Sequence, residues 1–145
     1  MHLQYEDAYL KQILTSVKTI ALVGASPKPH RDSHRVMAYL QARGYRVIPV
    51  NPTCRGEEML GERVYSRLED ISERIKIDMI DVFRRSDAVP EIVEAAIRIH
   101  AKVLWLQLGV IHGEAARRAE EHGIQVVMDR CPKIDMPRLG LDKTY

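Results

Sequence analysis

Five short apolar runs recur along the chain, separated by stretches in which apolar residues fall every three or four positions. The runs predict strands at residues 19–25, 45–51, 77–83, 102–109 and 125–129. The stretches between them predict helices at residues 33–43, 66–75, 87–100 and 113–122. A further amphipathic helix is expected within residues 1–17. The chain thus alternates strand and helix.

The predicted strands are too apolar to have a solvated face. Ile-Ala-Leu-Val at residues 20–23 and Val-Leu-Trp-Leu at residues 103–106 show no polar alternation, and Trp105 is expected in the core. Strands buried on both faces and separated by helices form a parallel sheet with right-handed crossovers. We therefore predict an α/β fold, a Rossmann-like doubly wound sheet of about five parallel strands in three α/β/α layers.

Length and composition indicate one small globular domain over residues 1–145, with residues 132–145 packed as a tail through Leu139 and Leu141. The composition is 46% apolar and 29% charged, and the net charge is +2. That charge gives no reason to expect a nucleic-acid partner, and no apolar run approaches the roughly 20 residues of a membrane span. With no signal-peptide pattern and only Cys54 and Cys131, a cytoplasmic protein without a disulfide framework is expected.

A glycine turn follows the first predicted strand. Gly24, Ala25 and Ser26 end that strand, and a helical pattern resumes within about ten residues. Glycine lets a backbone approach a ligand closely, and the free N–H groups of a helix start favour phosphate. Lys28 and Arg31 add positive charge to the same loop. This layout predicts a nucleotide phosphate site.

The end of the second predicted strand narrows the choice of nucleotide. A dinucleotide fingerprint requires three spaced glycines and an acid at this strand end. The loop has one glycine of the three, and the strand ends in Asn51, followed by Arg55. An uncharged strand end beside basic residues suits a phosphorylated ribose, which leaves NADP and coenzyme A (CoA) open.

Five segments at predicted strand ends together resemble a known family. They are Val-Gly-Ala-Ser-Pro-Lys-Pro at 23–29, the Gly-Tyr to Asn-Pro segment at 44–52, Asp-Val-Phe-Arg at 81–84, Trp-Leu-Gln-Leu-Gly-Val at 105–110 and Asp-Arg-Cys-Pro at 129–132. In this order and spacing they resemble the small stand-alone CoA-binding proteins of bacteria and archaea. Those proteins are similar in fold to the CoA-binding domain of the succinyl-CoA synthetase α subunit. The resemblance covers nearly the whole chain.

The resemblance implies a role for each strand end. The pyrophosphate of CoA would be held by the first loop, at Gly24, Ala25, Ser26, Lys28 and Arg31. Asn51 and Pro52 would flank the nucleoside, and Val82, Phe83 and Arg84 would pack against it. The pantetheine arm would run along residues 107–109, including Gln107 and Gly109. Many relatives have a lysine where this chain has Thr53, so Arg55 is the substitute expected for the ribose 3′-phosphate.

The function that these observations favour is binding of CoA or an acyl-CoA, without catalysis. No acid/base or nucleophile constellation is visible, and the histidine-bearing domain of the synthetase has no counterpart here. His30 and His34 lack a metal-ligand spacing, and Cys131, beside Arg130, is expected to be a buried structural thiol. The alternative is an NAD(P)-binding oxidoreductase or redox sensor. A homodimer or another protein partner is compatible with the sequence.

Overall fold

A sheet of five parallel strands forms the centre of the protein, which a computed structural model describes over residues 4–142. The strands are β1 (Thr19–Val23), β2 (Arg46–Val50), β5 (Met79–Val82), β6 (Val103–Leu106) and β7 (Gln125–Val127). Their spatial order is β2-β1-β5-β6-β7, and every neighbouring pair is parallel. The predicted α/β fold class is confirmed.

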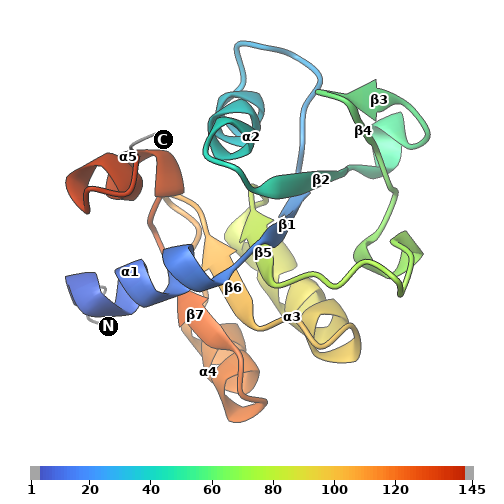
Figure 1. The fold of residues 1–145 in the computed structure, drawn as a ribbon. Coiled ribbons are helices and arrows are strands. Elements are labelled where there is room, and N and C mark those ends of the chain that lie inside the picture. Colours follow the sequence, from blue (N-terminus) through green and yellow to red (C-terminus); the bar gives the residue numbers. More distant parts are fainter. Residues whose placement is uncertain (1–3, 143–145) are drawn as a thin grey trace.

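Helices cover both faces of this sheet (Figure 1). On one face, α1 (Asp7–Ser16), α2 (Asp32–Ala42) and α5 (Pro132–Arg138) bury a core cluster that includes Trp105, whose indole N–H donates to the Arg130 carbonyl. On the other, α3 (Val89–Arg98) and α4 (Gly113–Glu121) bury a second cluster. Within the described part of the chain, no helix is long and apolar enough to cross a membrane.

The predicted helix at residues 66–75 is wrong. Only a single 3-10 turn forms, at Leu68–Asp70, and the rest of the segment is irregular. The Asp70 carboxylate accepts a hydrogen bond from the Arg67 backbone N–H, and the Ser72 hydroxyl accepts one from the Arg74 backbone N–H. Such local side-chain bonds offer the backbone an alternative to the helix. The face of the sheet beside α3 is therefore covered by a loop.

Two segments outside the predicted strands and helices also carry secondary structure. The loop after β2 holds a short antiparallel hairpin, β3 (Glu58–Met59) with β4 (Glu62–Arg63). The tail contains α5, and Leu139 and Leu141 pack on the chain's own core cluster. These leucines are therefore not an open partner surface. The outermost residues of the expected N-terminal helix and tail, 1–3 and 143–145, lie outside the described residues.

The strand order places a switch point between β1 and β5. From β1 the chain moves outward to β2, and it later returns to β5 on the other side of β1 and continues to β6 and β7. In open α/β sheets, ligands bind beyond the carboxyl ends of the strands at this reversal. Gly24 follows β1 and Phe83 follows β5, so both lie at the switch point.

Candidate functional site

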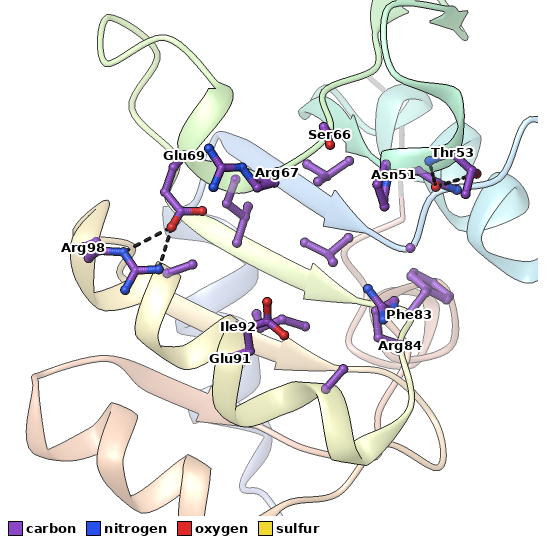
Figure 2. Close-up of a pocket in the computed structure, with 17 residues that line it drawn as sticks. Asn51, Thr53, Ser66, Arg67, Glu69, Phe83, Arg84, Glu91, Ile92 and Arg98 are labelled. Carbon is purple, nitrogen blue, oxygen red and sulfur yellow. Dashed lines mark hydrogen bonds and ion pairs between the residues drawn. The ribbon is translucent and has the colours of Figure 1, made fainter.

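Two cavities adjoin at the switch point, and they share Gly24, Asn51, Thr53 and Phe83 in their linings. The first, of about 720 Å³, lies between the 66–69 segment and α3 (Figure 2). The second, of about 600 Å³, lies between the loop after β1 and the start of α2. Together their linings include residues that follow β1, β2 and β5.

Gly24 lies directly against the backbone of Phe83. Its φ is +88°, and a Cβ built on it would lie 2.3 Å from the Phe83 carbonyl oxygen. Its backbone N–H donates to the Val50 carbonyl at 3.0 Å, while the Phe83 N–H donates to the Val23 carbonyl at 2.8 Å. Only glycine combines this φ with this approach. Gly24 thus closes the floor that the two cavities share.

Asn51 joins two loops of the site through its side chain. Its Nδ2 donates to the Ala25 carbonyl at 2.7 Å, and its Oδ1 accepts from the backbone N–H and the hydroxyl of Thr53 at 2.9 and 2.8 Å. The loop after β1 and the loop after β2 are therefore held in a fixed relation. The amide group at the end of β2 shapes both cavities.

The first loop then turns into α2 over the second cavity. His34 Nδ1 lies 3.0 Å from the Ser26 carbonyl oxygen, and the Ser26 hydroxyl accepts from the Lys28 backbone N–H at 3.2 Å. α2 begins one residue before the predicted start, and Arg31 at its N-cap makes no side-chain capping bond. Because uncapped N–H groups and the helix dipole favour negative charge, this end of the cavity suits an anion.

The cations that border the cavities fall into two sets. Lys28 and Arg31 at the second cavity, and Arg84 at the first, form no ion pair among the described residues. Arg67 and Arg98, at the far end of the first cavity, are paired with acids. Positive charge is therefore available to a ligand mainly at the switch point.

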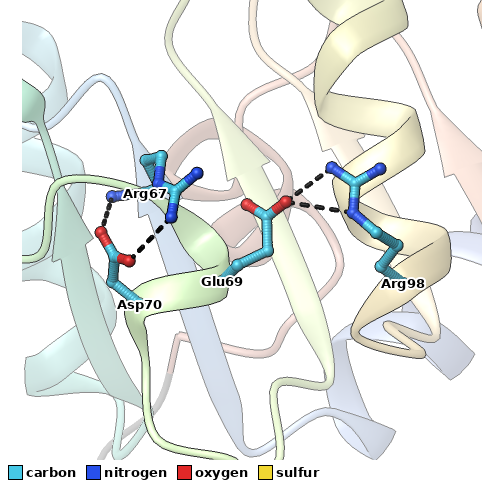
Figure 3. Close-up of polar contacts among 4 residues, drawn as sticks. All are labelled: Arg67, Glu69, Asp70 and Arg98. Atoms are coloured by element: carbon cyan, nitrogen blue, oxygen red, sulfur yellow. Dashed lines mark hydrogen bonds and ion pairs between the residues drawn. The ribbon is translucent and has the colours of Figure 1, made fainter.

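Two separate ion pairs lie at the far wall of the first cavity, Arg67 with Asp70 and Glu69 with Arg98 (Figure 3). Arg98 on α3 donates from Nε to the Glu69 carboxylate at 3.1 Å, and Arg67 pairs with Asp70 at 3.2 Å. The hydrogen bond from Arg98 lowers the pKa of Glu69. The Glu69–Arg98 pair bridges the irregular segment and α3, which are the two sides of the cavity.

Most of this far wall was missed by sequence reasoning. The missed lining residues are Ser66, Arg67, Leu68 and Glu69 from the irregular segment and Ala88, Glu91, Ile92, Ala95 and Arg98 at or on α3. The residues around α3 could have been predicted, because positions 88, 91, 92 and 95 are spaced so that they share one face of the predicted helix, which follows the third strand end. The segment gave no such signal, since its pattern indicated a helix.

The structure brings nine of the predicted binding residues to the two cavities, and four lie elsewhere. The nine are Gly24, Ala25, Ser26, Lys28, Arg31, Asn51, Pro52, Phe83 and Arg84. Val82 is fully buried inside the sheet, and Arg55 lines a separate cavity of about 510 Å³ that meets the first one at Ser66. Gln107 is buried and Gly109 is exposed, both in the turn after β6.

A buried carboxyl group lies beneath this edge of the sheet. Asp81 on β5 is fully buried and accepts a hydrogen bond from Gln107 Nε2 at 2.8 Å. Its second oxygen has no hydrogen-bond partner in the described part of the chain. Burial raises the pKa of Asp81 to about 7, although the bond from Gln107 acts in the opposite direction. The carboxyl group is thus held partly protonated near neutral pH.

The two cysteines are free thiols buried in the core. Cys131 is 7% exposed, as expected for a structural thiol, and burial is the main cause that raises its pKa. Cys54 borders the second cavity, and burial likewise raises its pKa. Thiolates are therefore disfavoured at both positions. Among residues 4–142, no cluster of histidine, cysteine and acidic side chains has the arrangement of a metal site.

The parallel sheet and the helices on its two faces place the protein in the Rossmann-like α/β class, and the comparison with family models is more specific. Residues 18–137 match the CoA binding domain family, so the chain belongs to that family. The resemblance found in the sequence is confirmed.

Three relatives extend over almost the same length. The uncharacterized protein YneT of Bacillus subtilis is 42% identical over 127 residues, which are 88% of this chain and 91% of YneT. A hypothetical protein from Pyrococcus horikoshii is 44% identical, with a TM-score of 0.86 over 93% of this chain and 92% of its own. The cell-free ID.343 protein from Thermus thermophilus is 38% identical, with a TM-score of 0.87 over 93% of this chain and 99% of its own.

Proposed function

We propose that this protein binds CoA or an acyl-CoA at the two adjoining cavities, and that affinity rather than catalysis is its task. The observation that carries the proposal is the position of the cavities. They meet at Gly24, the switch-point glycine, and are bordered by the unpaired cations Lys28, Arg31 and Arg84 in a chain of the CoA-binding family. An anionic nucleotide fits this arrangement of space and charge.

Each part of the ligand is assigned to a part of the site. The pyrophosphate lies in the second cavity against Ser26, Lys28 and the start of α2, where N–H groups and cations converge. The nucleoside lies in the first cavity, against Phe83 and Arg84. The pantetheine arm leaves along the turn after β6, at residues 107–109. Arg55 remains the candidate for the 3′-phosphate, from the cavity that meets the first one at Ser66.

Calorimetric titration of the purified protein tests the proposal. CoA, acetyl-CoA, dephospho-CoA, NADP and NAD are compared under one set of conditions. Saturable binding of CoA with weaker binding of dephospho-CoA supports the proposal and gives the 3′-phosphate a role. Binding of NADP or NAD without CoA would overturn it and favour the redox alternative. Acetyl-CoA that remains intact after prolonged incubation supports a role without catalysis.

Ser26→Trp is expected to weaken CoA binding at least about 100-fold, a loss of about 2.7 kcal/mol, while the fold is retained. Ser26 is half-buried on the second cavity, where an indole would occupy the space assigned to the pyrophosphate. Calorimetry measures the affinity, and thermal unfolding checks the fold. Ser16→Trp, on the exposed side of α1, is the matched control. Unchanged affinity in Ser26→Trp would place the ligand elsewhere.

Arg84 and its neighbour Arg85 offer a second matched pair. Both side chains are exposed, but only Arg84 borders the first cavity, whereas Arg85 lies 3.7 Å from the Asp87 carboxylate. Hydrogen bonds to charged groups contribute about 1.5–3 kcal/mol, so Arg84→Ala is expected to weaken CoA binding about 10-fold. Arg85→Ala should leave it within about twofold. Equal losses in the two variants would show a general electrostatic effect instead of a contact.

A further inference from the structure

The turn after β6 is held at three points by side chains from other elements. Gly109 donates its backbone N–H to the Asp129 carboxylate at 2.7 Å, and Ile111 donates its N–H to the Ser86 hydroxyl at 3.0 Å. Beneath the turn, the Gln107 side chain is anchored on Asp81. Within the turn, the Val110 backbone N–H donates to the Gln107 backbone carbonyl at 2.9 Å. Hydrogen bonds from three other elements therefore constrain the conformation of this turn.

Asp129, which anchors the turn, has a backbone conformation that residues other than glycine rarely adopt. It follows β7 with φ of +59°, in the left-handed region. Residues other than glycine seldom adopt this conformation unless their surroundings hold them in it, and aspartate is among the residues that tolerate it best. The conformation brings the Asp129 carboxylate to the Gly109 N–H. The strain therefore serves the anchoring of the neighbouring turn.

The anchored turn is bonded to the end of β5 that leads into the first cavity, although none of residues 107–111 lines that cavity itself. Gln107 donates its backbone N–H to the Val82 carbonyl, at the end of β5 just before Phe83. Ser86 begins a 3-10 turn, Ser86–Ala88, whose last residue lines the first cavity. The tip of the anchored turn carries Leu108, with 57% of its surface exposed. The turn thus presents one exposed apolar side chain and is bonded to the strand end just before Phe83, which lines the first cavity.

We propose that Asp129 and Ser86 are positioning residues that hold the turn of residues 107–111 ready for the pantetheine arm of the ligand. The inference rests on the proposed function, because it takes CoA as the occupant of the cavities. A flexible turn would have to be ordered when the ligand binds, at a cost to affinity. Asp129 and Ser86 order the turn when the protein folds, so no further ordering is needed when the ligand binds. Their loss should therefore lower the affinity for the pantetheine arm of CoA and not for its nucleotide part.

The test compares two ligands on the full-length protein. CoA carries the pantetheine arm, whereas adenosine 3′,5′-bisphosphate carries only the nucleoside with its phosphates. Asp129→Ala is expected to weaken binding of CoA about 10-fold and to leave binding of the bisphosphate within about twofold. Asp129→Asn should restore CoA binding, because its amide oxygen can accept the Gly109 N–H and asparagine tolerates a positive φ.

Two further variants keep the test decisive. Ser86→Ala removes the second anchor without touching Asp129, and it is expected to show the same selective loss if Asp129→Ala fails to fold. Ser26→Trp, in the pyrophosphate region, should weaken both ligands. Equal loss of the two ligands in the Asp129 and Ser86 variants, or no loss of CoA affinity, would overturn the inference while leaving the proposed function standing. Failure of the wild-type protein to bind either ligand would overturn both.

Discussion

Gly24→Ala is expected to abolish CoA binding and to lower the free energy of unfolding by about 2–4 kcal/mol. The new Cβ would lie 2.3 Å from the carbonyl oxygen and 2.9 Å from the carbonyl carbon of Phe83, at a φ of +88°. Both neighbours are backbone atoms between paired strands, so neither can move without disturbing β1 or β5. The floor shared by the two cavities would be displaced, and with it the ligand.

The matched control for this substitution is Gly123→Ala. Gly123 has a similar φ of +78°, but an added Cβ there would meet nothing within 4 Å. Gly123→Ala therefore carries the conformational cost alone, about 1–2 kcal/mol, and should bind CoA normally. Denaturant unfolding and calorimetry measure both quantities. A loss of stability at Gly24 no larger than that at Gly123 would contradict the close approach of β1 and β5.

Asp81→Asn is expected to become more stable relative to the wild type as the pH rises. The folded-state pKa of Asp81 is about 7, against 3.8 for the free side chain. As the pH rises from about 4 to about 7, the unfolded chain releases this proton while the folded protein retains it, so wild-type stability falls and then levels off. Below about pH 4 the carboxyl is neutral in both states and the penalty vanishes.

The asparagine cannot ionise, so it lacks this pH-dependent penalty. It retains an acceptor for Gln107, although its buried amide N–H₂ costs about 1–3 kcal/mol if left unpaired. That cost is independent of pH, so the informative quantity is the change in the difference between the proteins. The advantage of Asp81→Asn should grow by about 2–3 kcal/mol between pH 5 and pH 8. Urea unfolding at both values measures it.

An exposed acid gives the control for this series. Asp87→Asn, on the surface beside Arg85, should follow the pH profile of the wild-type protein. If Asp81→Asn also keeps the wild-type profile, Asp81 titrates as an ordinary carboxylate. The raised pKa inferred for this buried group would then be wrong.

The sheet and its helices could be predicted because they rest on local apolar periodicity. Runs such as Ile20–Val23 and Val103–Leu106 leave no polar face, and the structure buries both. The helix predicted at residues 66–75 does not form for a local reason that the spacing of apolar residues does not reveal. The Asp70 and Ser72 side chains bond to nearby backbone N–H groups there, so an apolar spacing suited to a helix is used by a loop.

The switch-point residues were predictable from their place at strand ends, whereas contacts between elements were not. The Asp81–Gln107 bond depends on strand register, because Asp81 pairs with Trp105 and Gln107 lies two positions further along the same side. Likewise, the far wall of the first cavity depends on how close the irregular segment comes to α3. Neither the order of the strands nor the distance between two elements follows from the spacing of residues within one element.

The amide of Asn51 limits how this scaffold could be redesigned. Dinucleotide-binding relatives of the fold place an acid at this strand end, where it holds a ribose. Here the same position must donate to the Ala25 carbonyl, and an ionised carboxylate has no proton to give. A single exchange to aspartate would set two oxygens against each other and release the loop after β1. Conversion to a dinucleotide-binding protein would therefore require rebuilding the phosphate loop together with the second strand end.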